Sequence, residues 1–568
     1  MSGPRRLLMI YPEFEPSYWG MQYSLSIVRR KSLMPPLGLL TIAALTPPEY
    51  EIRLVDLNTG PLSDADIEWA DLVLFSAMLV QKTALMRVAQ RCRDAGKLVV
   101  FGGPYPTACP DECRPWCDVL VLNEGEVTWP MFLSDLEAGA WRSTYSSLEK
   151  PDITKTPAPR FDLLNIADYV SIPIQYSRGC PFQCEFCDII VLFGRRPRVK
   201  TPEQLLAELD ALLATGYRGR VFIVDDNFIG NKREVVKLLP ELARWNRENG
   251  NPFSYGTEAT VNLADDAELL RRMVDAGFIF VFLGIETPSL ESLRETPKTQ
   301  NLPGGLLERV TKIQQAGLIV YGGFIVGFDN DPRDIFARQI EFIDQSAIAN
   351  AMIGPLMALP GTPLYERMEK EGRLLDSQDY GSWYGSGYTN ILTRIPRREL
   401  LEGHRRIVAN IYDPTRYFDR TLRSFQRLPR PQSKDERRAY VRWLVNAELK
   451  RSSSKEQAPK PSLWLTVKFF VNLYWSFPPE FRKPLGRFLW RVLRTCPEQM
   501  PRSLSFILMG YHCWRFTADY ILPRIEITRG SRAGAPAGFR PFSSPGLRLH
   551  RGPQCREHLR LQPSAYRR

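Results

Sequence analysis

The sequence predicts an α/β protein built from an N-terminal flavodoxin-like doubly wound sheet, a partial (βα)6 TIM-type barrel and a helical C-terminal domain. Two observations predict this. Short apolar runs alternate with helix-like stretches over residues 1–140 and again over 172–375, and such alternation indicates parallel sheets with helical crossovers. After residue 375 the strand pattern ends, and helix-like stretches rich in aromatic residues and arginine follow.

The composition limits the class of protein. The chain has 568 residues, of which 44% are hydrophobic and 24% charged. These values are near the average for globular proteins, so they exclude wholesale disorder, a coiled-coil rod and a collagen-like repeat. No uncharged apolar run is long enough for a transmembrane helix, and the first apolar run is too short for a signal peptide. The sequence therefore predicts a cytoplasmic protein.

The positive charge is concentrated at the C-terminus. The net charge is +12, from 75 basic and 63 acidic residues. Residues 531–568 hold eight Arg and one Glu, so they contribute 8 − 1 = +7, and the rest of the chain carries only +5. A nucleic-acid partner is therefore not expected. This Gly-, Pro- and Ser-rich segment is predicted to be a disordered basic tail. It contains no lysine, in contrast to the rest of the chain, and a non-native or frame-shifted end is one hypothesis for this difference.

The N-terminal domain, residues 1–140, is expected to contain five buried parallel strands. Helix-like stretches at Leu37–Leu45 and Lys82–Ala95 lie between them. Ligands of such sheets bind at the carboxyl ends of the strands. Those ends carry Asn58, Ser76, Gly102 and Gly103, and the segment Asn123–Glu126. The expected strands are Leu7–Tyr11, Glu51–Asp56, Leu72–Ser76, Leu98–Phe101 and Val119–Leu122.

A Pro-rich linker, 141–171, leads to the second alternating region, 172–375. Six βα units there are two fewer than a closed barrel needs, so a partial barrel is expected, with its functional groups at the carboxyl rim. Its strands are expected to end near Ser177, Val224, Thr257, Leu283, Phe324 and Met357.

The region 376–530 is predicted to be a helical domain that covers the mouth of the barrel. Its many aromatic side chains, interspersed with Arg and Lys, leave a second interpretation open. Such a mixture also suits a surface for an apolar substrate or for a membrane interface.

Three cysteines, Cys180, Cys184 and Cys187, have the spacing CxxxCxxC directly after the first expected barrel strand. Three thiolates on one loop can ligate three irons of a 4Fe–4S cluster and leave the fourth iron open, whereas an electron-transfer site uses four cysteines. Structural zinc also needs a fourth ligand, and the first histidine is His404. The spacing favours an iron–sulfur cluster over zinc or structural thiols.

Acidic and glycine residues follow the expected barrel strands in a characteristic order. With CxxxCxxC and the aromatic Phe186 before its last cysteine, this order resembles the radical S-adenosylmethionine (SAM) superfamily. The resemblance implies that residues at the strand ends contact SAM. Asp225 and Asp226 would lie near its amino group, and Gly323 near its adenine. The other polar contacts would come from Glu258, Gly284 and Glu286.

The resemblance implies radical chemistry. In this family the open iron chelates the amino and carboxylate groups of SAM. One electron from the reduced cluster then yields methionine and a 5′-deoxyadenosyl radical, which abstracts hydrogen from an unactivated carbon. A reductase or flavodoxin is the implied electron donor. The protein positions the reactants and excludes water, because the cofactor supplies the difficult chemistry.

The N-terminal domain resembles, in fold pattern and placement, the cobalamin-binding domain that precedes the barrel in one radical SAM branch. Such domains often carry DxHxxG, whose histidine ligates cobalt. Here Asn58 stands in that position, and no histidine precedes His404, so this domain offers no cobalt–histidine bond. Many relatives also lack that histidine. Asn58, Ser76, Gly102 and Gly103 are candidate contacts to the corrin or its nucleotide tail; the alternative is that they are ordinary turn residues.

A second cysteine triple, Cys109, Cys113 and Cys117, has the spacing CxxxCxxxC. A second cluster there would indicate methylthiotransferase-like sulfur insertion. Pro110 and Pro115 interrupt the segment, so structural thiols are the favoured interpretation.

The leading hypothesis is a cobalamin-dependent radical SAM methyltransferase with a 4Fe–4S cluster, SAM and cobalamin. It would methylate an unactivated carbon of a small molecule or lipid, and the resemblance to branch members that act on polycyclic lipids makes a hopanoid-like lipid a candidate. Peripheral membrane contact would fit such a substrate. The alternatives are a radical SAM cyclase or rearrangement enzyme without methyl transfer, the methylthiotransferase-like enzyme, and a non-catalytic binding protein with a structural metal.

Overall fold

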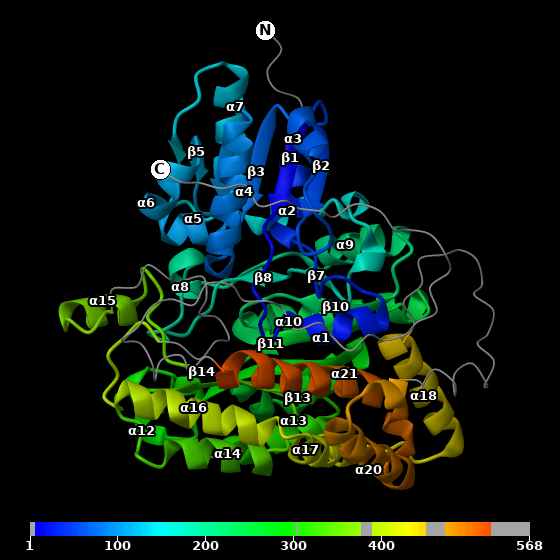
Figure 1. Ribbon diagram of the computed structural model, residues 1–568. Helices are drawn as coiled ribbons and strands as arrows, with labels where there is room; N and C mark the ends of the chain where they lie inside the picture. Colours follow the sequence, from blue (N-terminus) through cyan, green and yellow to red (C-terminus); the bar gives the residue numbers. More distant parts are fainter. Residues whose placement is uncertain (1–5, 303–304, 376–388, 450–470, 472, 524–568) are drawn as a thin grey trace, which may run out of the picture.

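The computed structural model of the chain describes residues 6–302, 305–375, 389–449, 471 and 473–523. The predicted basic tail, 531–568, lies outside the described residues. Figure 1 shows the three parts in order: the N-terminal sheet above, the barrel region in the middle and the C-terminal helices below. The α/β fold class predicted from the sequence is confirmed, with parallel sheets in the first two parts and helices in the third.

The first sheet has the strand order β2-β1-β3-β4-β5-β6, and all its strands are parallel. This is the flavodoxin-like order. The sheet has one strand more than predicted, because residues of the expected linker extend beside β5. A strand of two residues is too short to leave a hydrophobic pattern. The strands are β1 (Arg6–Tyr11), β2 (Glu51–Asp56), β3 (Leu72–Ser76), β4 (Leu98–Gly102), β5 (Val119–Val121) and β6 (Thr144–Tyr145).

Helices cover both faces of this sheet, which explains its continuous apolar strands. One face packs on α2 (Leu37–Leu45) and α7 (Gly125–Glu137). The other packs on α3 (Asp64–Trp69), α4 (Lys82–Asp94) and α5 (Pro104–Ala108), with α6 (Pro110–Cys113) beside them. In Figure 1, β1 runs from the top of the molecule down toward the barrel. Because the strands are parallel, all their carboxyl ends point toward the barrel.

The second sheet has the order β14-β13-β12-β11-β10-β7, so six parallel strands follow one another around an open barrel. Its strands are β7 (Ile172–Ile174), β10 (Gly219–Ile223), β11 (Phe253–Ala259), β12 (Phe278–Glu286), β13 (Ile319–Val326) and β14 (Ala351–Pro355). Its helices are α9 (Pro202–Ala214), α10 (Lys232–Glu248), α11 (Ala267–Ala276), α12 (Leu290–Glu295), α13 (Leu306–Ala316), α14 (Ile335–Gln345) and α15 (Pro363–Lys370).

Local sequence signals fix several of these helices. The Thr201 hydroxyl caps α9 by accepting a hydrogen bond from the Gln204 amide at 3.2 Å, and Pro202 occupies the first helical position. Asp266 caps α11 in the same way, and that helix ends at Gly277. These caps begin and end the helices where the strand-to-helix crossovers require it.

The first barrel unit differs from the others. After β7 the chain forms a short antiparallel ribbon of β8 (Ser177–Arg178) and β9 (Arg198–Val199). Residues 179–197, which contain the CxxxCxxC motif and α8 (Ile189–Leu192), form the loop between its two strands. The ribbon therefore brings the two ends of this loop together.

The C-terminal helices, which were expected to cover the barrel mouth, make several of their hydrogen bonds to the barrel near the amino end of β14. The Arg420 guanidinium donates to the carbonyls of Ile348 and Ala349, just before β14, and Tyr412 donates to Ala351 at its first residue. These contacts lie at the amino ends of the strands, opposite the carboxyl rim. The helices are α16 (Arg397–Ile411), α17 (Pro414–Arg427), α18 (Lys434–Leu449), α20 (Pro479–Thr495) and α21 (Met500–Phe516).

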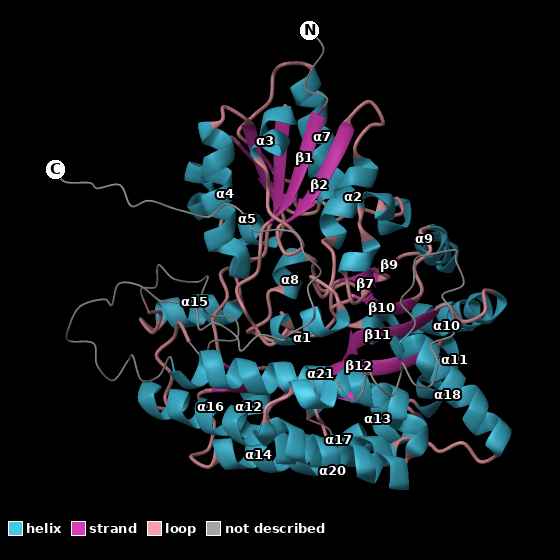
Figure 2. Cartoon of the chain, turned by 45° about the vertical axis from the view of Figure 1, so that its right-hand side comes forward, coloured by secondary structure: helices cyan, strands magenta, loops and turns pink. Residues whose placement is uncertain are grey.

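The aromatic residues of this region mostly form its own core. The Phe418 ring stacks on Phe488 at 4.9 Å, and Phe506 reaches Tyr321 of β13 at 6.3 Å. Figure 2 shows these helices packed together beneath the second sheet. None of the helices in the described part of the chain is long and apolar enough to cross a membrane.

The segment after β1 ties the first and third parts together. The Tyr18 hydroxyl lies 3.1 Å from the Thr517 hydroxyl, and His512 contacts the Ser17 carbonyl at 3.0 Å. The one-turn helix α1 (Gln22–Leu25) packs on α21. These contacts join residues almost 500 positions apart in the sequence.

Candidate cofactor site between the two sheets

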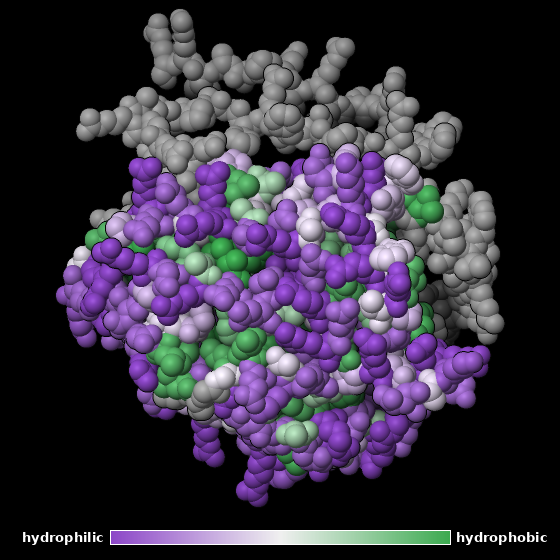
Figure 3. Space-filling model, turned by 90° about the horizontal axis from the view of Figure 1, so that it is seen from below, coloured by the Kyte–Doolittle hydropathy of each residue, from purple (hydrophilic) through white to green (hydrophobic). Residues whose placement is uncertain are grey.

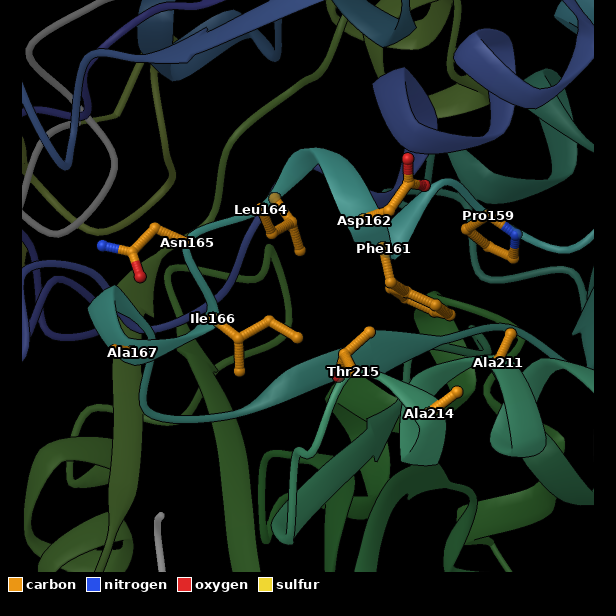
Figure 4. Close-up of a pocket in the computed structure, with 10 residues that line it drawn as sticks. All are labelled: Pro159, Phe161, Asp162, Leu164, Asn165, Ile166, Ala167, Ala211, Ala214 and Thr215. Carbon is orange, nitrogen blue, oxygen red and sulfur yellow. The ribbon is translucent and has the colours of Figure 1, made fainter. Parts of the chain in front are cut away.

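One cavity of the structure, of about 590 Å³, is not the candidate site. It lies between the segment 159–167 and the end of α9, and Figure 4 shows its lining side chains. None of the predicted site residues lines it. The candidate site is therefore built from the carboxyl ends of the two sheets.

Gly179 adopts a left-handed backbone conformation at the start of the cysteine loop. Its φ is +94°, and a Cβ there would lie 2.8 Å from the Gly194 carbonyl oxygen. Only glycine fits this conformation and this close approach. The Cys180 amide donates to the Gly194 carbonyl at 3.3 Å, and the Cys187 amide donates to the Cys184 carbonyl at 3.1 Å. The loop thus folds back on itself and presents its cysteines within a compact turn.

The three thiols lie in a protected environment with amide donors. Burial raises the pKa of Cys180 and Cys184, and raises that of Cys187 well above its usual value. The side-chain amides of Asn227 and Gln300 each lie 3.8 Å from a sulfur, of Cys180 and Cys184 respectively. Thiols with raised pKa values remain protonated until a metal replaces the proton. These surroundings fit a bound metal–sulfur group.

Among the described residues, no three Cys, His, Asp or Glu side chains have the geometry for a single metal ion. A 4Fe–4S cluster does not require that geometry, because each thiolate binds a different iron. The arrangement therefore fits a cluster better than a structural zinc ion, whose ligands all point at one atom.

Lys298 is a site residue that the sequence analysis missed. It is 5% exposed and forms an ion pair with Glu286, and its ammonium lies 5.8 Å from the centre of the Phe186 ring. It also lowers the pKa of Cys184 against the effect of burial. Lys298 follows a helix rather than a barrel strand, so no strand-end pattern identified it.

Glu286 and Gly284 form one unit with this lysine. Glu286 has φ +64°, and the register of β12 against β13 shifts between these two residues. A Cβ at Gly284 would lie 2.6 Å from the Glu286 carboxylate and 2.7 Å from the Lys298 ammonium. The glycine therefore leaves room for the ion pair. This places one carboxylate and one ammonium at the rim beside the cysteine loop.

Asp225, which was expected to contact SAM, is engaged in hydrogen bonds within the protein. Its carboxylate is fully buried and accepts hydrogen bonds from the Tyr176 amide at 2.7 Å, the Ser177 amide at 2.9 Å and the Ser177 hydroxyl at 2.6 Å. Burial raises its pKa to about 6. Because these bonds occupy both oxygens, Asp225 holds the ribbon that precedes the cysteines.

Asp226 and Glu258 are less fully engaged. The Gly179 amide lies 3.4 Å from the Asp226 carboxylate, and burial followed by the charge of Asp225 raises the Asp226 pKa to about 7. Burial, followed by the charges of Asp226 and Asp225, raises the Glu258 pKa to about 8. Within the described residues the Glu258 carboxyl has no hydrogen-bond partner, and it remains partly accessible. It is therefore available to a bound molecule.

This raised pKa predicts a pH effect on stability. A folded-state pKa above the unfolded value means that the folded protein holds the proton more tightly. The contribution of Glu258 to stability should therefore fall as pH rises from about 4.5 to about 8. In SAM-free protein, Glu258→Gln should flatten the pH dependence of the melting temperature in this window. Thermal scans at pH 5, 6.5 and 8 would measure it; parallel curves for the two proteins would contradict it.

The interior of the barrel presents apolar side chains below this rim. Phe222, Phe282 and Met352 keep partial exposure on three different strands, whereas their sequence neighbours are buried. A Cβ at Gly354 would meet no atom within 4 Å, so space is open there. The ring of Trp19, from the segment after β1, lies 5.5 Å from that of Phe282. The accessible interior is thus mainly aromatic and aliphatic.

Gly323 supports this interior wall. A Cβ there would lie 3.1 Å from the ring of Phe282. The absence of a side chain on β13 therefore lets the Phe282 ring lie against the strand. The sequence predicted Gly323 as an adenine contact, and in the structure its immediate neighbour is this ring.

Asn58, a candidate cobalamin contact, is hydrogen-bonded within its own loop. Its side-chain oxygen accepts from the Phe14 amide at 2.9 Å, and its nitrogen donates to the Asp56 carboxylate at 2.7 Å and to the Pro12 carbonyl at 3.2 Å. The other Asp56 oxygen accepts from Tyr169 at 3.0 Å. Asn58 thus organises the loops at the end of β1 and β2.

Ser76, Gly102 and Gly103 come together at the carboxyl ends of β3 and β4. Gly103 has φ +95°, and a Cβ there would lie 2.6 Å from the Ser76 hydroxyl and 3.1 Å from the Ala77 amide. A Cβ at Gly102 would lie 3.2 Å from the Val121 carbonyl. The side chain of Met78, next on the same rim, is 40% exposed. Without side chains at residues 102 and 103, this rim presents glycine backbone, which suits the close approach of a flat ring system such as a corrin.

The second cysteine triple lies in the core of the first domain. Cys109 and Cys113 are buried beneath the helices of one sheet face, and Cys117 packs against the same cluster. Burial raises the pKa of each to about 12. Their surroundings favour structural thiols over a second cluster.

Both described histidines are held by backbone carbonyls. His404 contacts the Ile353 carbonyl and His512 the Ser17 carbonyl, each at 3.0 Å. Burial lowers the pKa of each to about 4. Neither belongs to the rim of the first sheet, and His550 and His558 lie outside the described residues.

Three family models match successive parts of the chain. The "B12 binding domain" covers residues 23–133, the "Radical SAM superfamily" covers 174–343, and a "Domain of unknown function (DUF4070)" covers 362–522. An uncharacterised methyltransferase of Synechocystis sp. is 46% identical over 76% of this chain and 80% of its own length. The chain belongs to the radical SAM family with a B12-binding domain. Its cofactors are those of this family: a 4Fe–4S cluster, SAM and cobalamin.

Other relatives extend this assignment. The hopanoid C-2 methylase of Rhodopseudomonas palustris is 37% identical over 72% of this radical SAM enzyme and 77% of its own length. Among solved structures, the cobalamin-dependent radical enzyme OxsB matches 91% of this chain and 84% of its own with a TM-score of 0.55. The radical SAM methyltransferase TsrM from Kitasatospora setae matches 75% and 92% with a TM-score of 0.53. Both are 14% identical, so they show the shared fold.

Proposed function

We propose that this radical SAM enzyme transfers a methyl group to an unactivated carbon of an apolar small molecule or lipid. The observation that carries the proposal is the placement of the cysteine loop directly against the carboxyl rim of the first sheet. Helix α8 of that loop contacts α5 of the first domain. Two cofactors bound at these rims would face the same space, and transfer between reactants requires such proximity.

We assign the cofactor contacts by the neighbourhood of each residue. Cys180, Cys184 and Cys187 would hold the cluster, which supplies the electron that cleaves SAM. Ser76, Gly102 and Gly103 would receive the corrin. Around SAM, the ammonium of Lys298 suits a carboxylate group, and the carboxyl groups of Asp226 and Glu286 suit an amino group. Phe186, Glu258, Gly284 and Gly323 would line the remainder, whereas Asp225 and Asn58 would support the loops behind them.

The barrel interior favours an apolar substrate. Phe222, Phe282 and Met352 offer accessible apolar surface, and Trp19 lies over Phe282. Burial of fused hydrocarbon rings against such a wall is stabilising because apolar area leaves water. A hopanoid-like polycyclic lipid fits this wall, and one relative is a hopanoid C-2 methylase.

A membrane-resident substrate would call for contact with the bilayer surface. The outward side of α20 offers a surface of suitable chemistry, with Trp490 59% exposed between Lys483, Arg487 and Arg494. Trp475, 64% exposed, lies against the Arg482 guanidinium. Figure 3 views the molecule from below, where α20 lies in Figure 1, and shows hydrophobic patches among hydrophilic side chains. Tryptophan and arginine together suit the headgroup region.

Product analysis tests the reaction type. We expect anaerobically reconstituted enzyme, given a flavodoxin reducing system, SAM and a hopanoid as the probe, to release S-adenosylhomocysteine and 5′-deoxyadenosine in about equal amounts. Methyl transfer consumes one SAM for each of these products. A rearrangement or cyclisation would give 5′-deoxyadenosine without S-adenosylhomocysteine and would replace this proposal. Sulfur insertion would instead leave a methylthio group on the product.

The SAM contacts are tested separately. Asp226→Ala, Glu286→Ala and Lys298→Met each remove one charged hydrogen-bonding group, worth about 1.5–3 kcal/mol. Each variant should bind SAM about 10- to 100-fold more weakly and keep its iron. Equilibrium dialysis with radiolabelled SAM measures the affinity, and iron analysis measures the cluster. Unchanged affinity in all three variants would show that SAM binds elsewhere on the rim.

A further inference from the structure

Four charged residues connect the first domain to the cysteine loop. Glu124 follows β5, and its carboxylate accepts from Arg178 at 2.9 Å and from Arg198 at 2.8 Å. Arg178 also donates to Glu126 at 2.6 Å. The side chains are 3–16% exposed. We call these residues, Glu124, Glu126, Arg178 and Arg198, the interdomain network.

The two arginines occupy special places in the ribbon. Arg178 and Arg198 are register partners on β8 and β9. Arg178 precedes Cys180 by two residues, and Arg198 follows the last residue of the loop. Each arginine therefore stands at one end of the cysteine loop. By binding both, Glu124 holds the two ends of the loop against the first domain.

Their like charges make the shared carboxylate necessary. Two cations directly opposite each other on a ribbon repel. A buried carboxylate between them offsets that repulsion, and its removal leaves buried charges without compensation. Lys150 adds a further cation 3.6 Å from Glu124. The position of the ribbon should therefore depend strongly on Glu124.

Glu124 belongs to the rim that would receive the corrin. It lies three residues after Val121, whose register partner on β4 is Gly102. On the other side, the ribbon leads directly into the cysteines. Glu124 thus links the glycine-lined rim to the cysteine loop through two buried ion pairs, beside the contact of α8 with α5.

We propose that the interdomain network sets the separation and orientation of the iron–sulfur cluster relative to the corrin, with Glu124, Arg178 and Arg198 as positioning residues. This inference rests on the proposed function, because it assigns the two cofactors to the two rims. It goes further because it names the contact that holds the two cofactors at a fixed separation. Loss of the network should leave both cofactors bound but wrongly spaced, and small displacements cost rate steeply.

The test measures spacing directly. Both cob(II)alamin and the reduced cluster carry unpaired electrons, so cluster reduction speeds the relaxation of the cobalt signal in pulsed electron paramagnetic resonance. This enhancement decreases with the sixth power of distance. We expect the Glu124→Gln enzyme, loaded anaerobically with iron, sulfide and cobalamin, to keep wild-type iron and cobalt contents. It should lose about half or more of the enhancement.

Glu448→Gln is a matched control. Glu448 is also a carboxylate with 3% side-chain exposure between two arginines, Arg220 and Arg502, but it joins α18 to the amino end of the barrel. Its replacement disturbs stability in a comparable way without touching the cofactor rims. The enhancement should stay at the wild-type value. An equal loss in both variants would indicate general loosening and would overturn the proposal.

The remaining outcomes are distinct. Unchanged enhancement in Glu124→Gln with full cofactor contents would overturn the network's role and leave the proposed function standing. If this variant loses iron or cobalt, Arg198→Lys is measured instead; it keeps the positive charge but cannot form both hydrogen bonds of the Arg198 guanidinium to Glu124, and its result is interpreted in the same way. Failure of the wild-type enzyme to bind cobalamin would overturn the proposed function and the inference with it.

Discussion

Replacing Cys180, Cys184 and Cys187 together by alanine is expected to remove the iron–sulfur absorbance at roughly 400 nm and all SAM cleavage. The loop places the three thiols beside the amide donors Asn227 and Gln300, and burial keeps their pKa values raised in the absence of metal. Without these three thiolates the loop has no sulfur ligand left for a cluster. Anaerobic reconstitution, iron and sulfide analysis and absorbance spectroscopy measure the loss.

The control is the second triple. The combined replacement of Cys109, Cys113 and Cys117 should leave the iron content near the wild-type value. These thiols pack in the core of the first domain and are not expected to bind the cluster. Serine is the better replacement for the partly exposed Cys117, and alanine for the two buried cysteines. Equal iron loss from both triples would indicate two clusters and support sulfur insertion. Loss of zinc rather than iron from the first triple would contradict the cluster assignment.

Much of the fold was predictable because its signals are local. The bounds of β2, β3 and α2 agree with the prediction residue for residue, since buried parallel strands and their crossover helices leave short apolar runs. The two-residue strand β6 leaves no such run. The position of the C-terminal helices was also beyond the sequence, because aromatic residues at helical spacing show that a face is buried but not against which part of the protein.

The same difference between local signals and long-range contacts applies to the candidate site. The cysteine spacing is a local motif, and the strand-end rule placed Asp226, Glu258 and Glu286 on one rim. Asp225 and Asn58 each bind backbone groups that lie 44 to 49 residues away in the sequence, so their supporting roles could not be derived from the sequence pattern. The interdomain network has the same character: Glu124 lies at a predicted strand end, but its arginine partners are 54 and 74 residues further on.

Among the described residues no histidine is placed to ligate cobalt, and this has a spectroscopic consequence. Asn58 replaces the histidine of DxHxxG and is bonded within its loop. His404 and His512 are buried, and each is held by a carbonyl remote from the first rim. Bound Co(II) cobalamin should therefore show no nitrogen superhyperfine splitting from a protein imidazole. It should be five-coordinate with water, or four-coordinate.

Gly103→Val is expected to abolish cobalamin binding, and with it the electron paramagnetic resonance signal of bound Co(II) cobalamin. The residue has φ +95°, which L side chains rarely adopt, and the new Cβ would lie 2.6 Å from the Ser76 hydroxyl and 3.1 Å from the Ala77 amide. The ends of β3 and β4 would have to separate, and the two branches of valine would project into the rim. Cobalt content after anaerobic reconstitution should fall to background, while iron content stays near the wild-type value.

Gly96→Val is the control, because it introduces backbone strain in the same domain without changing the rim. Gly96 also has a positive φ, +70°, but no atom lies within 4 Å of its would-be Cβ. It ends α4, at the opposite end of β4 from Gly103. This variant carries a similar conformational cost and should still bind cobalamin. Equal cobalt loss in both variants would mean that any strain in this domain prevents binding. An imidazole signal in the wild-type enzyme would contradict the ligation argument and require a histidine from the C-terminal region to reach the corrin.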